Sequence, residues 1–217
     1  MNRRHLMLGA AALGAAPAVQ AIEQPAYEVL LQDGAFELRQ YEPMLLAQVE
    51  VDGDASTART AGFRLLAGYI FGGNQGQRKI AMMAPVTQAP AGEKIAMTAP
   101  VTQAAVPRDG RREGQGDSGE PERWQVTFMM PRAYTLDTLP VPQDPRVRFV
   151  MAPAEKRAVV RFAGLSSESN LGQHRAQLQA WVQQRGLQAV GGYTSAFYND
   201  PFTLPWNRRN EWWVSVQ

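Results

Sequence analysis

Residues 94–103 read Lys-Ile-Ala-Met-Thr-Ala-Pro-Val-Thr-Gln and repeat, at nine of ten positions, the stretch that begins 15 residues earlier at 79–88, Lys-Ile-Ala-Met-Met-Ala-Pro-Val-Thr-Gln. Two copies are too few for a solenoid, which needs at least about three stacked units to bury its core. We therefore interpret the pair as two related strands of a hairpin, with Ala89-Pro90-Ala91-Gly92 as the turn. The proline in each copy interrupts its strand or places it at a sheet edge.

Upstream of the repeat, the sequence predicts strands and then a helix. Short, partly alternating runs lie at 27–32, 36–41 and 45–51. Asp33-Gly34 between the first two runs is a strong hairpin signal. Apolar residues then recur at helical spacing up to Gly72-Gly73, which predicts an amphipathic helix with Asp54 or Ser56 as its N-cap.

Downstream, further strands surround a second helix. The helix is capped by Ser166 or Ser167 and ends near Gly186, and its apolar face carries Leu171, Leu178, Trp181 and Val182. Besides 79–88 and 94–103, strands are expected at 124–130, 147–151, 158–162, 193–198 and 211–216. Two helices cannot cover so many strands on both faces. The pattern therefore favours an α+β fold, a curled antiparallel sheet with the helices outside.

The stretch 107–123 is expected to be a mobile loop within one domain. It is rich in glycine, mixes both charge signs and has no apolar side chain between 108 and 119. Strands on both sides look like members of one sheet, so we expect a single domain over 22–217.

The first 21 residues are typical of a secretory signal peptide. Arg3 and Arg4 precede an apolar, Ala/Gly-rich run, and Val19-Gln20-Ala21 places small residues at the expected cleavage positions. The paired arginines resemble a twin-arginine export signal. The run is too short to span a bilayer of about 30 Å. We expect export to the periplasm or beyond, without a stable membrane anchor after cleavage; a surface helix and an uncleaved anchor are the alternatives.

Charge and composition exclude several functions. The net charge of +2 comes entirely from Arg3 and Arg4, and the rest of the chain carries 20 basic and 20 acidic side chains. Such a chain has no global field to attract nucleic acid. With no cysteine, disulfides, thiolate metal sites, a cysteine nucleophile and covalent heme attachment are excluded. The two histidines are His5 and His174, so a multi-histidine metal site within one mature chain is excluded too.

Several ordered blocks now make a family resemblance visible. The motif Lys94-Ile95-Ala96-Met97-Thr98-Ala99-Pro100-Val101 resembles the signature of the SOUL heme-binding family. The resemblance covers 27–217, and its further blocks are Tyr41-Glu42-Pro43, Gly62-Phe63-Arg64-Leu65-Leu66, Tyr69-Ile70-Phe71-Gly72, Val126-Thr127-Phe128-Met129-Met130-Pro131, Tyr198-Asn199-Asp200-Pro201 and 204–211 (Leu-Pro-Trp-Asn-Arg-Arg-Asn-Glu).

The resemblance implies a fold and a ligand. Members of the family form a distorted antiparallel β-barrel, here of about eight strands, flanked by two α-helices and built from two pseudo-symmetric halves. That topology is similar to the effector-binding domains of multidrug regulators. The implied cofactor is heme, bound without a covalent link.

The candidate site residues follow from the motif and from heme chemistry. Heme iron is held by His, Met, Cys or Tyr, which leaves His174, a methionine, a tyrosine or no protein ligand. Met82, Met83 and Met97 would form a flexible apolar wall or simply fill the core. Lys79 and Lys94 would pair with ligand carboxylates or lie solvated at strand ends. His174 lies on the apolar helix face, where a structural role is the alternative to iron ligation.

A second candidate region lies near the C-terminus. Arg208 and Arg209 next to Trp206, Trp212 and Trp213 form either a cationic, aromatic rim or an ordinary strand with two paired arginines.

Three functions compete. The first is binding of heme or a related tetrapyrrole in an apolar cleft, as a carrier, buffer or scavenger. The second is binding of another flat apolar molecule, as multidrug-regulator domains do. The third is an enzyme of tetrapyrrole metabolism, which finds no support because the single mature histidine has no activating motif near it and no pair of acids stands out.

Overall fold

A computed structural model describes residues 23–75, 95, 97–106, 123–199 and 202–217. Eleven strands and three helical segments lie within these ranges. The strands are β1 (Tyr27–Asp33), β2 (Phe36–Tyr41), β3 (Met44–Asp52), β4 (Asn74–Gln75), β5 (Val101–Ala105), β6 (Arg123–Met129), β7 (Val141–Pro142), β8 (Arg148–Ala152), β9 (Glu155–Phe162), β10 (Ala189–Phe197) and β11 (Asn210–Val216). The helices are α1 (Ala55–Ile70), α2 (Glu168–Gln184) and a 3₁₀ turn at Pro205–Asn207.

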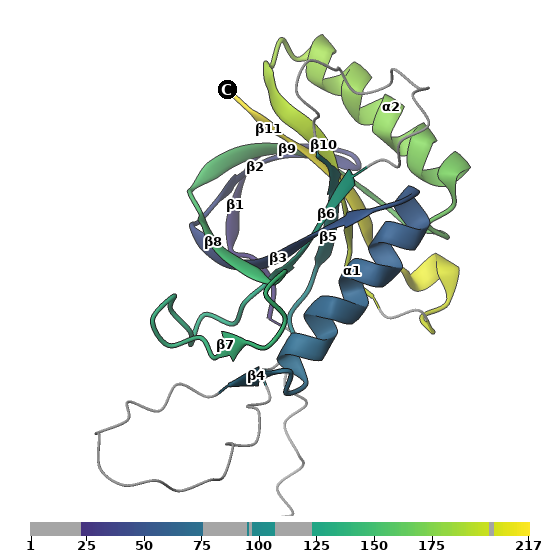
Figure 1. The fold of residues 1–217 in the computed structure, drawn as a ribbon. Coiled ribbons are helices and arrows are strands. Elements are labelled where there is room, and N and C mark those ends of the chain that lie inside the picture. The colour runs from purple at the N-terminus through teal and green to yellow at the C-terminus, as the bar shows by residue number, and fades with distance from the viewer. Residues whose placement is uncertain (1–22, 76–94, 96, 107–122, 200–201) are drawn as a thin grey trace, which may run out of the picture.

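Nine of these strands form one antiparallel sheet in the order β1-β2-β9-β11-β10-β5-β6-β3-β8. The α+β class with a large antiparallel sheet and two helices is therefore confirmed. Figure 1 shows the sheet strongly curled. The expected barrel is not confirmed, because in the described part of the chain β1 pairs only with β2 and β8 only with β3, which leaves an open sheet with two edges. The pseudo-two-fold relation between halves stays a prediction.

Both helices begin where the sequence predicts. Asp54 caps α1 by accepting hydrogen bonds from the backbone N–H groups of Ser56 and Thr57, at 2.9 and 3.0 Å. Ser167 caps α2 by accepting one from Asn170, at 3.3 Å. These side chains satisfy donors that have no partner within the helix, which fixes the first turn.

Each helix covers a different part of the same sheet face, as Figure 1 shows. Helix α1 packs on β3 and β6, and α2 packs on β9, β10 and β11. Two apolar clusters fill these interfaces, one around Leu66 and Val126, the other around Leu178 and Val214. The side of the sheet away from the helices, which we call the concave face, is therefore free to carry polar side chains.

The second copy of the repeat is a strand only in its last part. The strand expected over 94–103 begins at Val101, because the backbone before it bonds elsewhere: the Ile95 N–H donates to the Ile70 carbonyl and the Ala99 N–H to the Glu23 carbonyl. Pro100 has no N–H to donate to a ladder. The strand expected over 79–88 lies outside the described residues, as does the loop expected over 107–123 except for Arg123, which is the first residue of β6.

No helix among the described residues has both the length and the apolar character needed to cross a bilayer.

Candidate functional site

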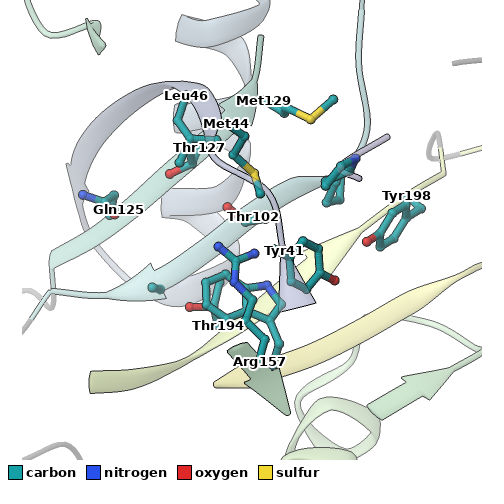
Figure 2. Close-up of a pocket in the computed structure, with 14 residues that line it drawn as sticks. Tyr41, Met44, Leu46, Thr102, Gln125, Thr127, Met129, Arg157, Thr194 and Tyr198 are labelled. Atoms are coloured by element: carbon teal, nitrogen blue, oxygen red, sulfur yellow. The ribbon is translucent and has the colours of Figure 1, made fainter. Parts of the chain in front are cut away.

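The concave face holds a cavity of about 90 Å³. Its lining combines methionine, aromatic, hydroxyl and amide side chains with one guanidinium (Figure 2): Pro25, Tyr41, Met44, Leu46, Pro100, Thr102, Ala104, Gln125, Thr127, Met129, Arg157, Thr194, Tyr198 and Trp213. Apolar and hydrogen-bonding groups thus meet in one hollow, as in small-molecule sites generally.

Strand register places these side chains side by side. Trp213 on β11 pairs with Thr194 on β10, Thr194 with Ala104 on β5, and Ala104 with Gln125 on β6. Since paired residues project to the same face of a sheet, four strands contribute one row of side chains to the cavity.

Arg157 lies between two aromatic rings. Its guanidinium carbon is 3.8 Å from the ring centroid of Trp213 and 4.6 Å from that of Tyr41. Nε donates to Glu155 at 2.7 Å, and Nη2 donates to the same carboxylate oxygen. The other oxygen of Glu155 accepts from the Ser215 hydroxyl at 2.6 Å. The cation is therefore held by stacking and by hydrogen bonds in one orientation, which Figure 2 shows directed towards the middle of the lining.

A buried ionic cluster adjoins the cavity. Glu211, 1% exposed, accepts two hydrogen bonds from Arg39 at 3.0 and 3.1 Å and two from Arg209 at 3.0 and 2.8 Å. Its carboxylate also accepts from the Tyr198 hydroxyl at 2.9 Å, and Arg39 donates to the Tyr41 hydroxyl at 2.9 Å. Hydrogen bonds from this cluster thus hold the hydroxyl groups of both tyrosines that line the cavity.

The charges of this cluster set the protonation of its members. Burial by itself would raise the pKa of Glu211, but Arg39 and Arg209 together outweigh it, so the pKa lies below its usual value. Burial raises the pKa of Tyr41 although Arg39 opposes it. Burial and the negative charge of Glu211 also raise the pKa of Tyr198. Both phenols are therefore neutral at ordinary pH.

A second cavity of about 250 Å³ adjoins the first. The two share Pro25, Met44 and Met129 in their linings. The second cavity adds mostly apolar side chains, one tyrosine and two charged side chains, Glu42 and Arg132: Ala26, Glu42, Pro43, Leu45, Met130, Pro131, Arg132, Tyr134 and Met151.

The predicted motif residues are only partly described. Lys79, Met82, Met83 and Lys94 lie outside the described residues. Met97 is 42% exposed and lines neither cavity. The neighbouring Thr98 hydroxyl donates to the Met129 carbonyl, and Pro100 and Thr102 line the first cavity. The end of the motif is therefore part of the cavity, while the role of its lysines and methionines stays a prediction.

His174 packs against the sheet on the helix side. Its ring stacks on Phe162 with centroids 4.1 Å apart, and its Nδ1 lies 2.8 Å from the Asn170 carbonyl oxygen. It lines neither cavity. The structure does not bring His174 together with Met97 or the cavity methionines, and iron ligation by His174 stays a prediction. Within the described residues, no three His, Cys, Asp or Glu side chains cluster as metal ligands would.

The five residues of the suggested C-terminal rim do not lie together. Trp213 lines the first cavity, whereas the indole N–H of Trp212 donates to the Leu171 carbonyl under α2. Trp206 is 70% exposed. Arg209 is paired with Glu211, and Arg208 donates to the Thr203 carbonyl.

Sequence reasoning missed Tyr41 and Arg157 as cavity residues. Tyr41 belongs to one of the family blocks. Arg157 and Val159 are two positions apart on β9 and therefore lie on the same face of the strand. Alternation shows that Arg157 and Val159 share a face but not that this face is enclosed.

Comparison with known proteins identifies the family. A model of the SOUL heme-binding protein family matches residues 22–92 and 88–215. Heme-binding protein 2 of Homo sapiens is 29% identical over 204 residues, which span 91% of this chain and 87% of the human protein. The names of the family and of the human protein both refer to heme binding, in agreement with the expectation of a binding protein.

Solved structures of low sequence identity share the fold. The C-terminal domain of EcmrR has a TM-score of 0.56 and 9% identity, with 88% of this chain and 98% of that domain covered. A hydrolase from Listeria innocua has a TM-score of 0.51 and 12% identity, with coverages of 87% and 94%. At such identities the likeness concerns the fold alone. The family match over nearly the whole chain is a different kind of finding: this chain belongs to the SOUL heme-binding protein family.

Proposed function

We propose that the protein binds heme or a related tetrapyrrole, without a covalent link, on the concave face where the two cavities meet. The observation that carries this proposal is the shared wall of Met44 and Met129, flanked by Tyr41 and Trp213. A porphyrin is a large flat hydrophobe, and burial of its faces contributes about 25 cal/mol per Å² before the costs of association.

The residues present fit such a ligand. Small-molecule sites usually measure about 300–1,000 Å³, and the two adjoining cavities together reach the lower end of that range. Methionine side chains are adaptable, so the shared wall can move to admit a macrocycle. When bound, heme would supply an iron that can take a side-chain ligand, and thioethers such as those of Met44 and Met129 are among the groups that serve. We propose that enclosure of the macrocycle, rather than iron ligation by the protein, supplies most of the affinity, because the described lining is largely apolar and aromatic.

The cellular setting completes the proposal. A twin-arginine-like signal over 1–21 would deliver a single SOUL-type domain, 22–217, to the periplasm, where it would act as carrier, buffer or scavenger. Intact-mass measurement of the periplasmic protein should then show a chain that starts at Ile22. A full-length cytoplasmic species alone would refute the export step.

Titration with hemin and with metal-free protoporphyrin tests the binding function. We expect both to bind, with affinities within about tenfold of each other, because coordination is secondary. Met44→Glu should weaken both, whereas Leu136→Glu, an exposed change outside both cavities, should weaken neither. His174→Ala should leave both affinities unchanged.

Two outcomes would redirect the proposal. If Met97→Glu weakens binding and Met44→Glu does not, the ligand lies at the motif rather than on the concave face. If neither porphyrin binds while a smaller flat aromatic compound does, the second hypothesis, a binding module for another apolar molecule, replaces the first. The small volume of the first cavity is the observation that favours that alternative.

A further inference from the structure

We propose that Arg157 is a carboxylate anchor, so that the protein selects planar ligands that carry a carboxylate at their edge. This inference rests on the proposed function and specifies the ligand class at the same site. The ligand's acidic edge would enter the first cavity while its flat apolar part lies on Met44 and Met129 in the second.

The first argument is the guanidinium that remains available. Nε and Nη2 of Arg157 are used by Glu155, whereas within the described part of the chain no hydrogen bond joins Nη1. Arg157 is 7% exposed, yet it lines the cavity, so its unused N–H groups face an enclosed space rather than bulk water. A carboxylate there would form charge-assisted hydrogen bonds that are screened little by solvent.

The second argument is that the Arg157 guanidinium is already ordered before a ligand binds. The ring centroids of Trp213 and Tyr41 lie 3.8 and 4.6 Å from the guanidinium carbon, and Nε donates a hydrogen bond to Glu155. An arginine already ordered in its binding geometry loses little conformational entropy when a ligand arrives. Glu155 is also the reason to expect a moderate effect, because its charge partly offsets the attraction for an anion.

The third argument is the opposite wall. Thr102 and Thr127 are register partners on β5 and β6, and both line the cavity together with Thr194. Hydroxyl groups can donate to the second oxygen of a carboxylate that Arg157 holds by the first. Among the described residues that line the first cavity, Arg157 is the only basic one. Arg132 lines the second cavity, but its side chain is 62% exposed and pairs with Glu23, so we assign the charge recognition to Arg157.

Binding of protoporphyrin and of its dimethyl ester separates charge recognition from enclosure, since the two differ only in the carboxylates. We expect the wild-type protein to bind the free acid about tenfold or more tightly than the ester. Arg157→Gln should weaken the acid to about the affinity of the ester and leave the ester unchanged. Arg157→Lys should restore part of the preference. Arg161→Gln, an exposed change on the same strand, should keep the full preference.

The outcomes are distinguishable. Equal binding of acid and ester by the wild type would overturn the anchor while the proposed function stands. A preference that survives in Arg157→Gln would place the anchor elsewhere. Failure of both porphyrins to bind would overturn the proposed function and the anchor together. Circular dichroism and melting temperature report whether each variant is folded. If Arg157→Gln does not fold, equal binding of acid and ester by the wild type still overturns the anchor, and Arg157→Lys, which keeps the charge but changes its geometry, tests whether the preference depends on this residue.

Discussion

Arg39 and Glu211, 172 positions apart, form a two-point ion pair at 3.0 and 3.1 Å in which both side chains are 1% exposed. Burial by itself would lower the pKa of Arg39, but Glu211 and Tyr41 together raise it far above the usual range. The pair joins β2 to β11 across β9, and its hydrogen bonds fix Tyr41 and Tyr198 beside the cavity. The stability of the fold and the positions of these two cavity tyrosines thus depend on one buried cluster.

Glu211→Gln should destabilise the fold strongly. The change removes the carboxylate that Arg39 and Arg209 share and leaves Arg39, among the described residues, only its ion pair with Glu37. Breaking a buried pair in this way costs about 3–5 kcal/mol. Thermal and urea unfolding measure the loss. Asp52→Asn is the matched control, because the Arg123–Asp52 pair has both side chains about half exposed and such pairs contribute at most about 1 kcal/mol. Equal losses in the two variants would contradict the importance of the cluster.

The pH dependence of unfolding should reveal the lowered pKa of Glu211. A carboxyl whose folded pKa lies below its ordinary value of 4.5 stabilises the fold fully above that value, and this contribution is lost as the pH falls towards the folded pKa. The difference in unfolding free energy between wild type and Glu211→Gln should therefore stay constant at neutral pH and shrink below pH 4.5. Urea titrations at several pH values measure this difference. A difference that grows in acid would show that the pKa of Glu211 is raised in the folded state instead of lowered.

Two glycines of α1 should respond oppositely to alanine. A Cβ on Gly62 would lie 2.5 Å from Val126 Cγ2, so Gly62→Ala should overpack the interface with β6 and cost about 1–3 kcal/mol. A Cβ on Gly68 would meet nothing within 4 Å, so Gly68→Ala should stabilise the helix by about 0.4–1 kcal/mol. Melting temperatures compare the two. A stabilising Gly62→Ala would mean that helix and sheet are less closely packed than the structure has them.

Replacement of 107–122 by a short Gly/Ser turn should leave the fold intact. The Val106 N–H donates to the Arg123 carbonyl at 2.8 Å, and Ala105 pairs with Trp124, so the ends of the segment are already adjacent. The entropic free-energy cost of closing a loop changes by only about 0.6 kcal/mol for each doubling of its length. The melting temperature and porphyrin affinity should both be near the wild-type values. A collapse of either would show that the segment packs on the domain or takes part in binding.

Local signals in the sequence predicted local structure well. Asp33-Gly34 marked the turn between β1 and β2, where Gly34 has a φ of +60° that favours glycine. Asp54 and Ser167 marked the helix starts, and the spacing of Leu178, Trp181 and Val182 identified the buried face of α2. Each of these features is decided by hydrogen bonds or burial within a few residues, which is why the sequence alone suffices.

The sequence by itself therefore determined the family, the α+β class and the positions of most helices and strands. Only the tertiary structure decided that β9 lies between β2 and β11, that Arg39 meets Glu211, and that Arg157 and Trp213 line a cavity instead of facing solvent. Alternation tells which residues share a face of a strand, but strand order and the enclosure of a face follow from pairing over long separations. Those pairings are chosen by the burial of apolar surface under two helices, a property of the whole chain.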